Sequence, residues 1–247
     1  MLEIEYDPLL VGVSIAVAIW GSWTAFVLTF GIRKQARTTA QKAVLCINSA
    51  VVMGGSIWAM HFIAMLAVGF PVAVTYNTFE TVASLVLAIG FCGLGLYVAL
   101  EKSTSLHGVL GGGTLMGLGM SGMHYLGVCA IRGCAVSFNM AGVALSILVA
   151  IVASSASLWF VFRNRGISET VLGGLIMGMA SASMHFIAMY ATVFVSNPSF
   201  IAVSDSGLSQ SILAYAIAMA AFAVCAAQLL MATSASTTLV DKSSGIP

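Results

Sequence analysis

The stretch Met53-Gly-Gly-Ser-Ile-Trp-Ala-Met-His61-Phe-Ile-Ala-Met65 recurs twice later in the chain, as Met116-Gly-Leu-Gly-Met-Ser-Gly-Met-His124-Tyr-Leu-Gly-Val128 and Met177-Gly-Met-Ala-Ser-Ala-Ser-Met-His185-Phe-Ile-Ala-Met189. Relative to each histidine, Met stands at −8 and −1, Gly at −7, Phe or Tyr at +1 and Ala at +6. The histidines lie 63 and 61 residues apart, a spacing that suits one helical hairpin per copy. The repeat therefore predicts three hairpins, each carrying one histidine at a similar depth.

The composition around the repeat indicates a membrane protein. Of 247 residues, 9 are Lys or Arg and 8 are Asp or Glu, so 7% carry charge while 60% are apolar. Soluble domains carry about 25% charged residues. A net charge of +1 without a basic run excludes an electrostatic nucleic-acid binder, and the high apolar content excludes a disordered chain.

Seven apolar stretches are long enough to cross a bilayer, which needs roughly 20 apolar residues per helix. Their approximate bounds are 9–32, 43–67, 82–100, 109–131, 140–162, 170–195 and 211–233. We therefore expect an all-α integral membrane protein. It is a single seven-helix bundle over residues 1–233, made of three pseudo-repeated hairpins plus one helix, and a short polar tail follows at 234–247.

The few charges predict an orientation for the bundle. Basic residues occupy every second junction, and the opposite junctions are acidic except for Arg132. The basic set is Arg33, Lys34, Arg37, Lys42, Lys102, Arg163, Arg165 and Lys242, and the acidic set is Glu3, Glu5, Asp7, Glu80 and Asp205. The positive-inside rule then places the N-terminus outside and the tail in the cytoplasm. The acidic N-terminus is unlike a cleaved signal peptide, so the first span is expected to remain.

Three histidines near the outer ends of three spans predict a metal site, because an ionisable residue inside a membrane is costly without a function. Imidazole binds Zn, Cu, Fe and Ni, and thioether favours Cu(I), so copper is the expected ion. The spans offer no carboxylate for Mg²⁺ or Ca²⁺. The candidate ligands are His61, His124, His185, Met60, Met123, Met184, Met65 and Met189.

Structural roles compete with metal binding at each of these positions. Membrane histidines often hydrogen-bond between helices, and methionine often fills gaps in cores. We interpret the −8 methionines, Trp58 and Tyr125 as packing residues, and His107 as solvated. The motif glycines should let a neighbouring helix or a ligand approach the backbone. Cys129 and Cys134 are candidates for an outer disulfide, and Cys129 is an alternative soft ligand beside Val128.

The triplicated Met-His-Phe/Tyr pattern resembles the MHYT domain, a bacterial integral-membrane sensor module, over the chain from the first to the seventh span. The resemblance implies sensing of oxygen, carbon monoxide or nitric oxide through copper at the periplasmic face of the inner membrane. The ligands that it implies are Met60 with His61, Met123 with His124, and Met184 with His185, with Met65 and Met189 matching a downstream Met.

The chain departs from the family pattern at three residues and in its domain content. Phe62 and Phe186 stand where the name-giving Tyr would be, and Val128 replaces the downstream Met. Members of the family are often fused to domains that make or degrade cyclic di-GMP, or to histidine kinases, and these 247 residues contain neither. The resemblance therefore implies a separate cytoplasmic signalling partner.

Two classes of function fit these residues. The leading hypothesis is a non-enzymatic sensor whose copper site meets a diatomic gas or a redox signal, with the glycine-rich fourth span as a sliding surface. The alternative is a copper transport or delivery protein. A retinal photoreceptor is excluded because the seventh span has no Lys for a Schiff base. A metal hydrolase would need a general acid or base, for which the outer side offers only Glu80 and Asp205.

Overall fold

The computed structural model describes residues 4–35, 39–72, 74–101, 105–163, 167–196 and 214–230. The six labelled helices are α1 (Pro8–Gln35), α2 (Thr39–Leu66), α3 (Thr78–Glu101), α4 (Leu106–Cys129), α5 (Met140–Arg163) and α6 (Ile167–Tyr190). A seventh helix covers Ala214–Leu230. The expected tail at 234–247, the ends of the expected seventh span, and the charged residues Glu3, Arg37, Lys102, Arg165, Asp205 and Lys242 lie outside the described residues.

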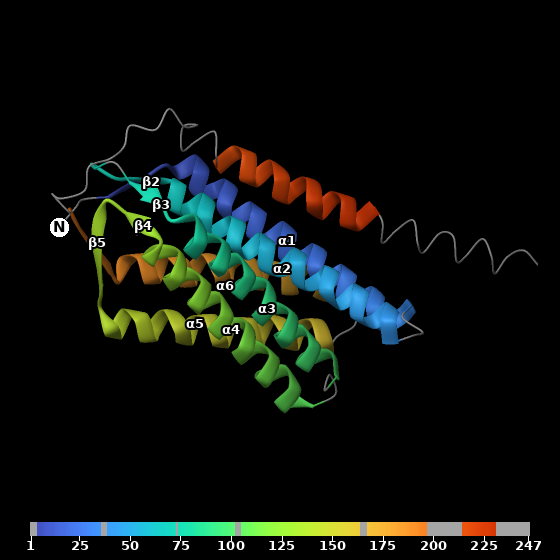
Figure 1. The fold of residues 1–247 in the computed structure, drawn as a ribbon. Coiled ribbons are helices and arrows are strands. Elements are labelled where there is room, and N and C mark those ends of the chain that lie inside the picture. Colours follow the sequence, from blue (N-terminus) through green and yellow to red (C-terminus); the bar gives the residue numbers. More distant parts are fainter. Residues whose placement is uncertain are drawn as a thin grey trace, which may run out of the picture.

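The helices α1 to α6 form a closed ring of three hairpins (Figure 1). Each helix packs against its two neighbours in sequence, and α1 closes the ring by packing against α6. The three even-numbered helices also contact one another. These are the helices that carry the repeated motif, so the fold brings the three copies to the axis of the bundle.

The helices identify a multi-pass membrane protein. Five of them, α1, α2, α3, α5 and α6, are long and apolar enough to span a bilayer. The helix α4 has the same 24-residue length as α3, but its many glycines lower its hydropathy. The helix Ala214–Leu230 is shorter than a typical span. The expected helices are thus all present over the described residues, while length and hydropathy single out five of the seven as spans.

The six short strands of the described residues gather at one end of the bundle, which we call the strand end (Figure 1). They are β1 (Glu5–Tyr6), β2 (Val68–Gly69), β3 (Thr75–Tyr76), β4 (Ile131–Arg132), β5 (Cys134–Phe138) and β6 (Thr192–Ser196). They pair antiparallel as β1–β2, β3–β4 and β5–β6, so every pair joins the segment before one hairpin to the segment that follows an even-numbered helix. These strands qualify the all-α expectation.

Two expected span boundaries are wrong for this reason. The fourth span was expected to reach residue 131 and the sixth residue 195, but α4 ends at Cys129 and α6 at Tyr190. The residues beyond the helix ends are apolar, so hydropathy alone joined them to the helix. In the structure they belong to β4 and β6, where their backbone groups pair with β3 and β5.

Three N-cap residues bind the backbone of the Ala at +6 of the motif. Asp7, Asn77 and Asn139 precede α1, α3 and α5, and their side-chain oxygens accept hydrogen bonds from backbone N–H groups of the first helical turn. Their own N–H groups donate to the carbonyls of Ala67, Ala130 and Ala191 at 2.8–2.9 Å. Each cap thereby fastens the start of one odd-numbered helix to the end of an even-numbered one.

The motif glycines let each even-numbered helix pack closely against a helix of a neighbouring hairpin. A Cβ atom added at Gly54 would lie 2.5 Å from the Cα atom of Ile89 in α3. The same atom at Gly117 would lie 2.6 Å from Ile151 in α5, and at Gly178 it would lie 2.6 Å from Ile19 in α1. The expectation that these glycines admit a neighbour close to the backbone is confirmed, and that neighbour is another helix.

Two adjacent glycines of α2 offer a matched test of this contact. We expect Gly54→Ala to lower the free energy of unfolding by about 1–3 kcal/mol, because the new methyl group meets the backbone of α3. Gly55→Ala meets no described atom within 4 Å, and the better helix propensity of Ala should leave stability unchanged or raise it by up to about 1 kcal/mol. Thermal unfolding of the two variants in detergent measures the difference, and equal melting temperatures would contradict the close contact.

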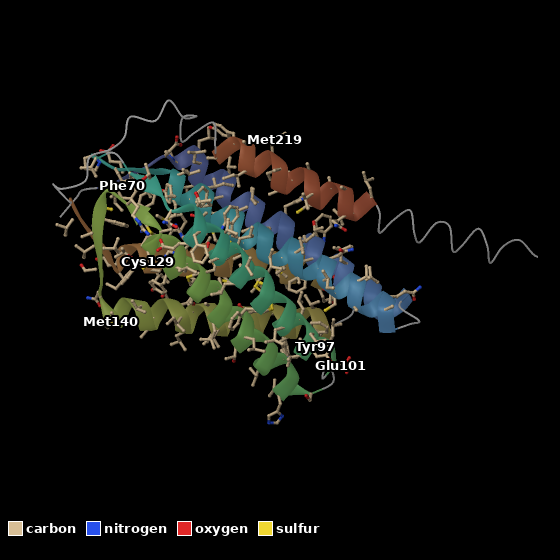
Figure 2. The ribbon with its side chains drawn as sticks, viewed as in Figure 1. Phe70, Tyr97, Glu101, Cys129, Met140 and Met219 are labelled. Carbon is tan, nitrogen blue, oxygen red and sulfur yellow. The ribbon has the colours of Figure 1, made fainter. Side chains whose placement is uncertain are left out.

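The helix Ala214–Leu230 lies outside the ring against α1 and α2 (Figure 1). Its small residues Ala214 and Ala218 are buried in a cluster with Leu10, Val17 and Ile63. Its Phe222 ring lies 6.2 Å from the ring of Trp20, and Met219 points away from the bundle (Figure 2). This helix breaks the threefold pattern of the ring.

Candidate metal centre

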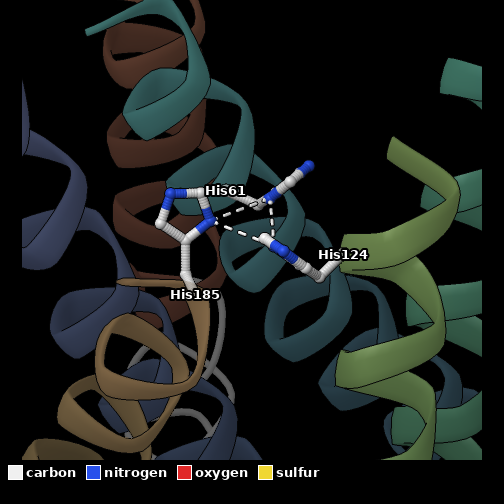
Figure 3. Close-up of side chains that lie close together, drawn as sticks. All are labelled: His61, His124 and His185. Atoms are coloured by element: carbon white, nitrogen blue, oxygen red, sulfur yellow. Dashed lines mark hydrogen bonds between the residues drawn. The ribbon is translucent and has the colours of Figure 1, made fainter. Parts of the chain in front are cut away.

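The three motif histidines meet on the axis of the bundle (Figure 3). Their Nδ1 atoms lie 3.1 Å apart between His61 and His185, 3.2 Å between His124 and His61, and 3.2 Å between His124 and His185. The side chains are 0–1% exposed. The expectation of three histidines at one depth is confirmed, and the structure adds that one nitrogen of each ring points to a common centre.

The three Nδ1 atoms cannot satisfy one another. A neutral imidazole has one N–H donor and one acceptor nitrogen, so each Nδ1 carries either a proton or a lone pair in the ring plane. A closed cycle of three hydrogen bonds would need every Nδ1 to donate and accept at once. At least one contact therefore joins two groups of the same kind, and a cation at the centre would bind all three lone pairs.

The outward-facing nitrogens of the three rings lack partners. The Nε2 atoms of His61, His124 and His185 are buried and have no hydrogen-bond partner in the described part of the chain. A structural histidine that joins two helices would be expected to use its nitrogens in hydrogen bonds, because a buried unpaired polar group costs about 1–3 kcal/mol. A histidine that binds an ion through Nδ1 also carries an N–H group at Nε2 that needs an acceptor, so these atoms favour neither role.

The spacing of the three nitrogens fits a metal ion. An ion about 2.0 Å from each of three nitrogens in tetrahedral geometry holds them about 3.3 Å apart, close to the distances in this structure. The three imidazoles then occupy three positions and leave a fourth for a further ligand. Imidazole nitrogens suit Cu, Zn, Fe and Ni.

The downstream residues of the three motifs form a cover over the histidines. Met65, Val128 and Met189 stand one helical turn further toward the strand end, and they are buried together in one cluster with Ile131 and Phe194. Val128 takes the place of a methionine within this cluster. The structure thus brings Met65 and Met189 together, on the strand side of the histidines, and their role as ligands stays a prediction.

The methionines directly before the histidines pack in different clusters. Met60 packs in a small cluster with Ala18 and Ala64, while Met123 and Met184 belong to the large central core. All three are fully buried. Their placement follows the expected angle of about 100° between successive residues of a helix, and their role as metal ligands also stays a prediction.

The residues assigned to packing are confirmed in that role. The −8 methionines Met53, Met116 and Met177 are all 0% exposed in the central core. The Trp58 indole donates a hydrogen bond to Ser84, and the Tyr125 hydroxyl pairs with Ser146 at 2.7 Å. The imidazole of His107 is exposed, as expected.

The alternative of Cys129 as a soft ligand is wrong. Cys129 is an exposed residue at the strand end, and its thiol lies within the electrostatic influence of Glu80 and Arg132 (Figure 2). It follows Val128 by one residue, which turns its side chain about 100° away from the buried cluster. Cys129 and Cys134 are both free thiols in this structure, so the suggested disulfide is absent.

Arg132, the exception to the charge pattern, has a partner. Both of its contacts to the Glu80 carboxylate are short, at 2.8 and 2.9 Å, and the pair is partly exposed at the strand end. Each side chain thereby neutralises the charge of the other. The exception therefore does not weigh against the orientation expected from the other charges.

A ring of aromatic contacts at the strand end was missed by the sequence analysis. Each motif residue at +1 meets the aromatic residue that precedes an N-cap, at ring-centroid distances of 5.1–5.8 Å. The pairs are Phe62 with Tyr76, Tyr125 with Phe138, and Phe186 with Tyr6. The sequence signal was an aromatic residue directly before Asp7, Asn77 and Asn139, which recurs once per hairpin.

Tyr76, one member of these aromatic pairs, also contacts the cover formed by Met65, Val128 and Met189. Its hydroxyl donates a hydrogen bond to the carbonyl of Met65, at 3.5 Å. Burial, with a smaller contribution from the nearby Cys134, raises the pKa of the Tyr76 phenol. The hydroxyl therefore stays protonated and remains a donor at physiological pH.

A family model agrees with these observations. The MHYT model, described as a bacterial signalling protein N-terminal repeat, matches residues 1–41, 54–112 and 117–174. The three matched segments cover more than half of the chain. No solved structure matches the chain.

Several curated relatives match most of the chain. The bifunctional diguanylate cyclase/cyclic di-GMP phosphodiesterase MucR of Pseudomonas aeruginosa is 32% identical over 94% of this chain and 34% of its own length. The cyclic di-GMP phosphodiesterase NbdA of the same organism is 31% identical over 76% of this chain and 24% of its length. The signaling protein YkoW of Bacillus subtilis is 26% identical over 78% of this chain and 25% of its length. The chain thus spans about a third of the first of these relatives and about a quarter of the other two.

Proposed function

Because this chain belongs to the MHYT family of bacterial signalling proteins, we propose that it is a membrane sensor module in which His61, His124 and His185 hold one copper ion through their Nδ1 atoms. The observation that carries the proposal is the convergence of three buried Nδ1 atoms at 3.1–3.2 Å. We place the module in the bacterial inner membrane, with the strand end toward the periplasm, as the charge pattern favours.

The signal that we propose is a diatomic gas, namely oxygen, nitric oxide or carbon monoxide, or the redox state of the site. Copper when bound supplies two oxidation states and an open position for a small ligand. The chain supplies a dry and apolar enclosure, since the histidines are 0–1% exposed beneath a cluster of Met65, Val128 and Met189. Such an enclosure favours small uncharged molecules, and an ion enters it at a cost unless the ion is paired and hydrogen-bonded inside.

The enclosed site favours a resident ion over an ion in transit. The histidines are closed on the strand side by the apolar cover and by the paired strands that extend it. An ion that passed through would have to displace this packing on every passage. A resident ion suits a sensor better than a copper transport or delivery protein.

The way in which the site acts on the bundle follows from its position. Each histidine comes from a different hairpin, so a change in the geometry of the ion alters the relative placement of all three hairpins. The even-numbered helices pack against the neighbouring hairpins at their motif glycines. We propose that these close contacts, above all those of the glycine-rich α4, are the surfaces that shift. A ligand drives such a shift only as far as its affinities for the two arrangements differ.

The output that we propose is the turnover of cyclic di-GMP. Two of the relatives are named for this activity, and the chain covers 34% and 24% of their lengths. The membrane module itself is proposed to be non-catalytic, and the signal passes to a cytoplasmic signalling domain on the same polypeptide or on a partner.

Purified protein in detergent, loaded with Cu(I), tests the proposal. We expect one copper ion per chain and a single C–O stretching band in the infrared spectrum under carbon monoxide. We also expect disulfide cross-linking rates between cysteines introduced in facing positions of α4 and α5 to change on adding copper and gas. Protein that retains no stoichiometric copper would overturn the metal site, and cross-linking unaffected by copper and gas would overturn the sensing mechanism.

A further inference from the structure

The surroundings of the three histidines differ on their two sides. On the strand side stand Met65, Val128 and Met189, which are apolar and packed together. On the opposite side, one turn earlier in each helix, stand Ile57, Met120 and Ser181, all of them buried. Ser181 is the single hydroxyl among these six residues.

The Ser181 hydroxyl has no hydrogen-bond partner in the described part of the chain. This is unusual for a helical serine here, because Ser14, Ser56, Ser84, Ser121 and Ser146 each donate to a carbonyl three or four residues earlier. Ser22 and Ser49 also lack partners. However, Ser49 lies three turns before His61, and Ser22 lies on α1, which carries none of the three histidines. Ser181 alone combines an unpartnered hydroxyl with a position next to the three histidines.

The geometry of the helix places Ser181 on the same face of α6 as His185, one turn earlier. Residues four apart share one face of a helix. A helical side chain also tilts toward the N-terminus of its helix, over the turn that precedes it. His185 therefore leans toward Ser181, and the turn of α6 on this side of the three Nδ1 atoms carries one hydrogen-bond donor.

We propose that Ser181 is a positioning residue, whose hydroxyl donates a hydrogen bond to a small ligand with an acceptor atom when that ligand binds at the open position of the ion. This inference rests on the metal site proposed above and adds that the ligand lies on the side away from the strand end. A hydrogen bond to a polar or anionic ligand would compensate a buried hydroxyl that the protein itself leaves unpaired. This hydrogen bond would favour ligands that gain negative charge on binding over ligands that do not.

The test compares Ser181→Ala with Ser121→Ala in the full chain loaded with Cu(II). Ser121 is a buried serine three residues before His124, and its hydroxyl donates to the carbonyl of Gly117. We expect both variants to retain copper, and azide, followed by its charge-transfer absorption, to bind the Ser181→Ala variant about tenfold more weakly than the wild type. The Ser121→Ala variant should bind azide like the wild type.

A second measurement separates a ligand contact from a structural role. In the metal-free protein, Ser181→Ala removes an unpartnered buried hydroxyl, so its melting temperature should equal or exceed that of the wild type. Unchanged azide affinity in Ser181→Ala, or a drop in its metal-free melting temperature, would overturn the role of Ser181 while leaving the metal site intact. A wild-type protein that binds no copper would overturn the metal site, and this inference with it.

Discussion

Replacing any one of His61, His124 and His185 with alanine is expected to remove bound copper from the protein. The structure offers three nitrogens as metal ligands, since the Nδ1 atoms of the three histidines all lie within 3.2 Å of one another. Loss of a group that only orients a ligand weakens metal binding 10- to 100-fold, so loss of a ligand should exceed about 100-fold. Metal analysis after dialysis against a competing chelator measures the effect.

The fourth histidine supplies the control for this prediction. His107 is exposed at the start of α4, far along the helix from the site, so His107→Ala should retain copper like the wild type. Circular dichroism of each variant checks that the helices remain. Full copper occupancy in any of the three buried variants would mean that the corresponding histidine is not a ligand.

Gly127→Ala is expected to weaken copper binding by about 10- to 100-fold, because it disturbs the position of a ligand without removing it. A Cβ atom at this position would lie 2.4 Å from Nε2 and 3.1 Å from Cδ2 of His61. The ring of His61 cannot withdraw freely, because its Nδ1 atom already lies 3.1–3.2 Å from those of His185 and His124. The added methyl group must therefore push the ring out of line with the other two.

Gly111→Ala is the matched control on the same helix. Its added Cβ atom would lie 3.7 Å from Val98, an ordinary contact, and alanine is the better helix former. We expect this variant to bind copper with the affinity of the wild type and to be equally or more stable. If Gly127→Ala had the same copper dissociation constant as Gly111→Ala, the space beside His61 would be irrelevant to the site.

The sequence predicted the three hairpins and the common depth of the histidines because the repeat records both. An interval of 61–63 residues allows two helices and two turns, and an invariant histidine at one position of each copy must then lie at one level. The motif glycines also predicted close helix contacts. The group that packs against each glycine could not be predicted, because the angular position of a glycine on its helix does not tell whether a helix or a ligand lies next to it.

The strand end could not be predicted, because β1 to β4 have only two residues each and show no alternation of apolar and polar side chains. The five residues of β6 directly continue the apolar run of α6. Ile131 and Thr192 therefore passed as continuations of helices, although their backbones pair with β3 and β5. The convergence of the Nδ1 atoms, and not the Nε2 atoms, depends on side-chain rotamers that the sequence does not encode directly. The hydroxyl of Ser181 was missed because serine is common in membrane helices and usually bonds to its own helix.

The X-ray absorption spectrum of the copper-loaded protein tests the central claim most directly, because it reports the atoms bound to the ion. The account predicts a first shell of three nitrogens at about 2.0 Å with the multiple-scattering pattern of three imidazoles. The family resemblance adds methionine sulfur as a candidate fourth ligand, and a scattering contribution at longer distance would reveal it. A first shell with fewer than two imidazoles, or one made mainly of sulfur, would contradict the account.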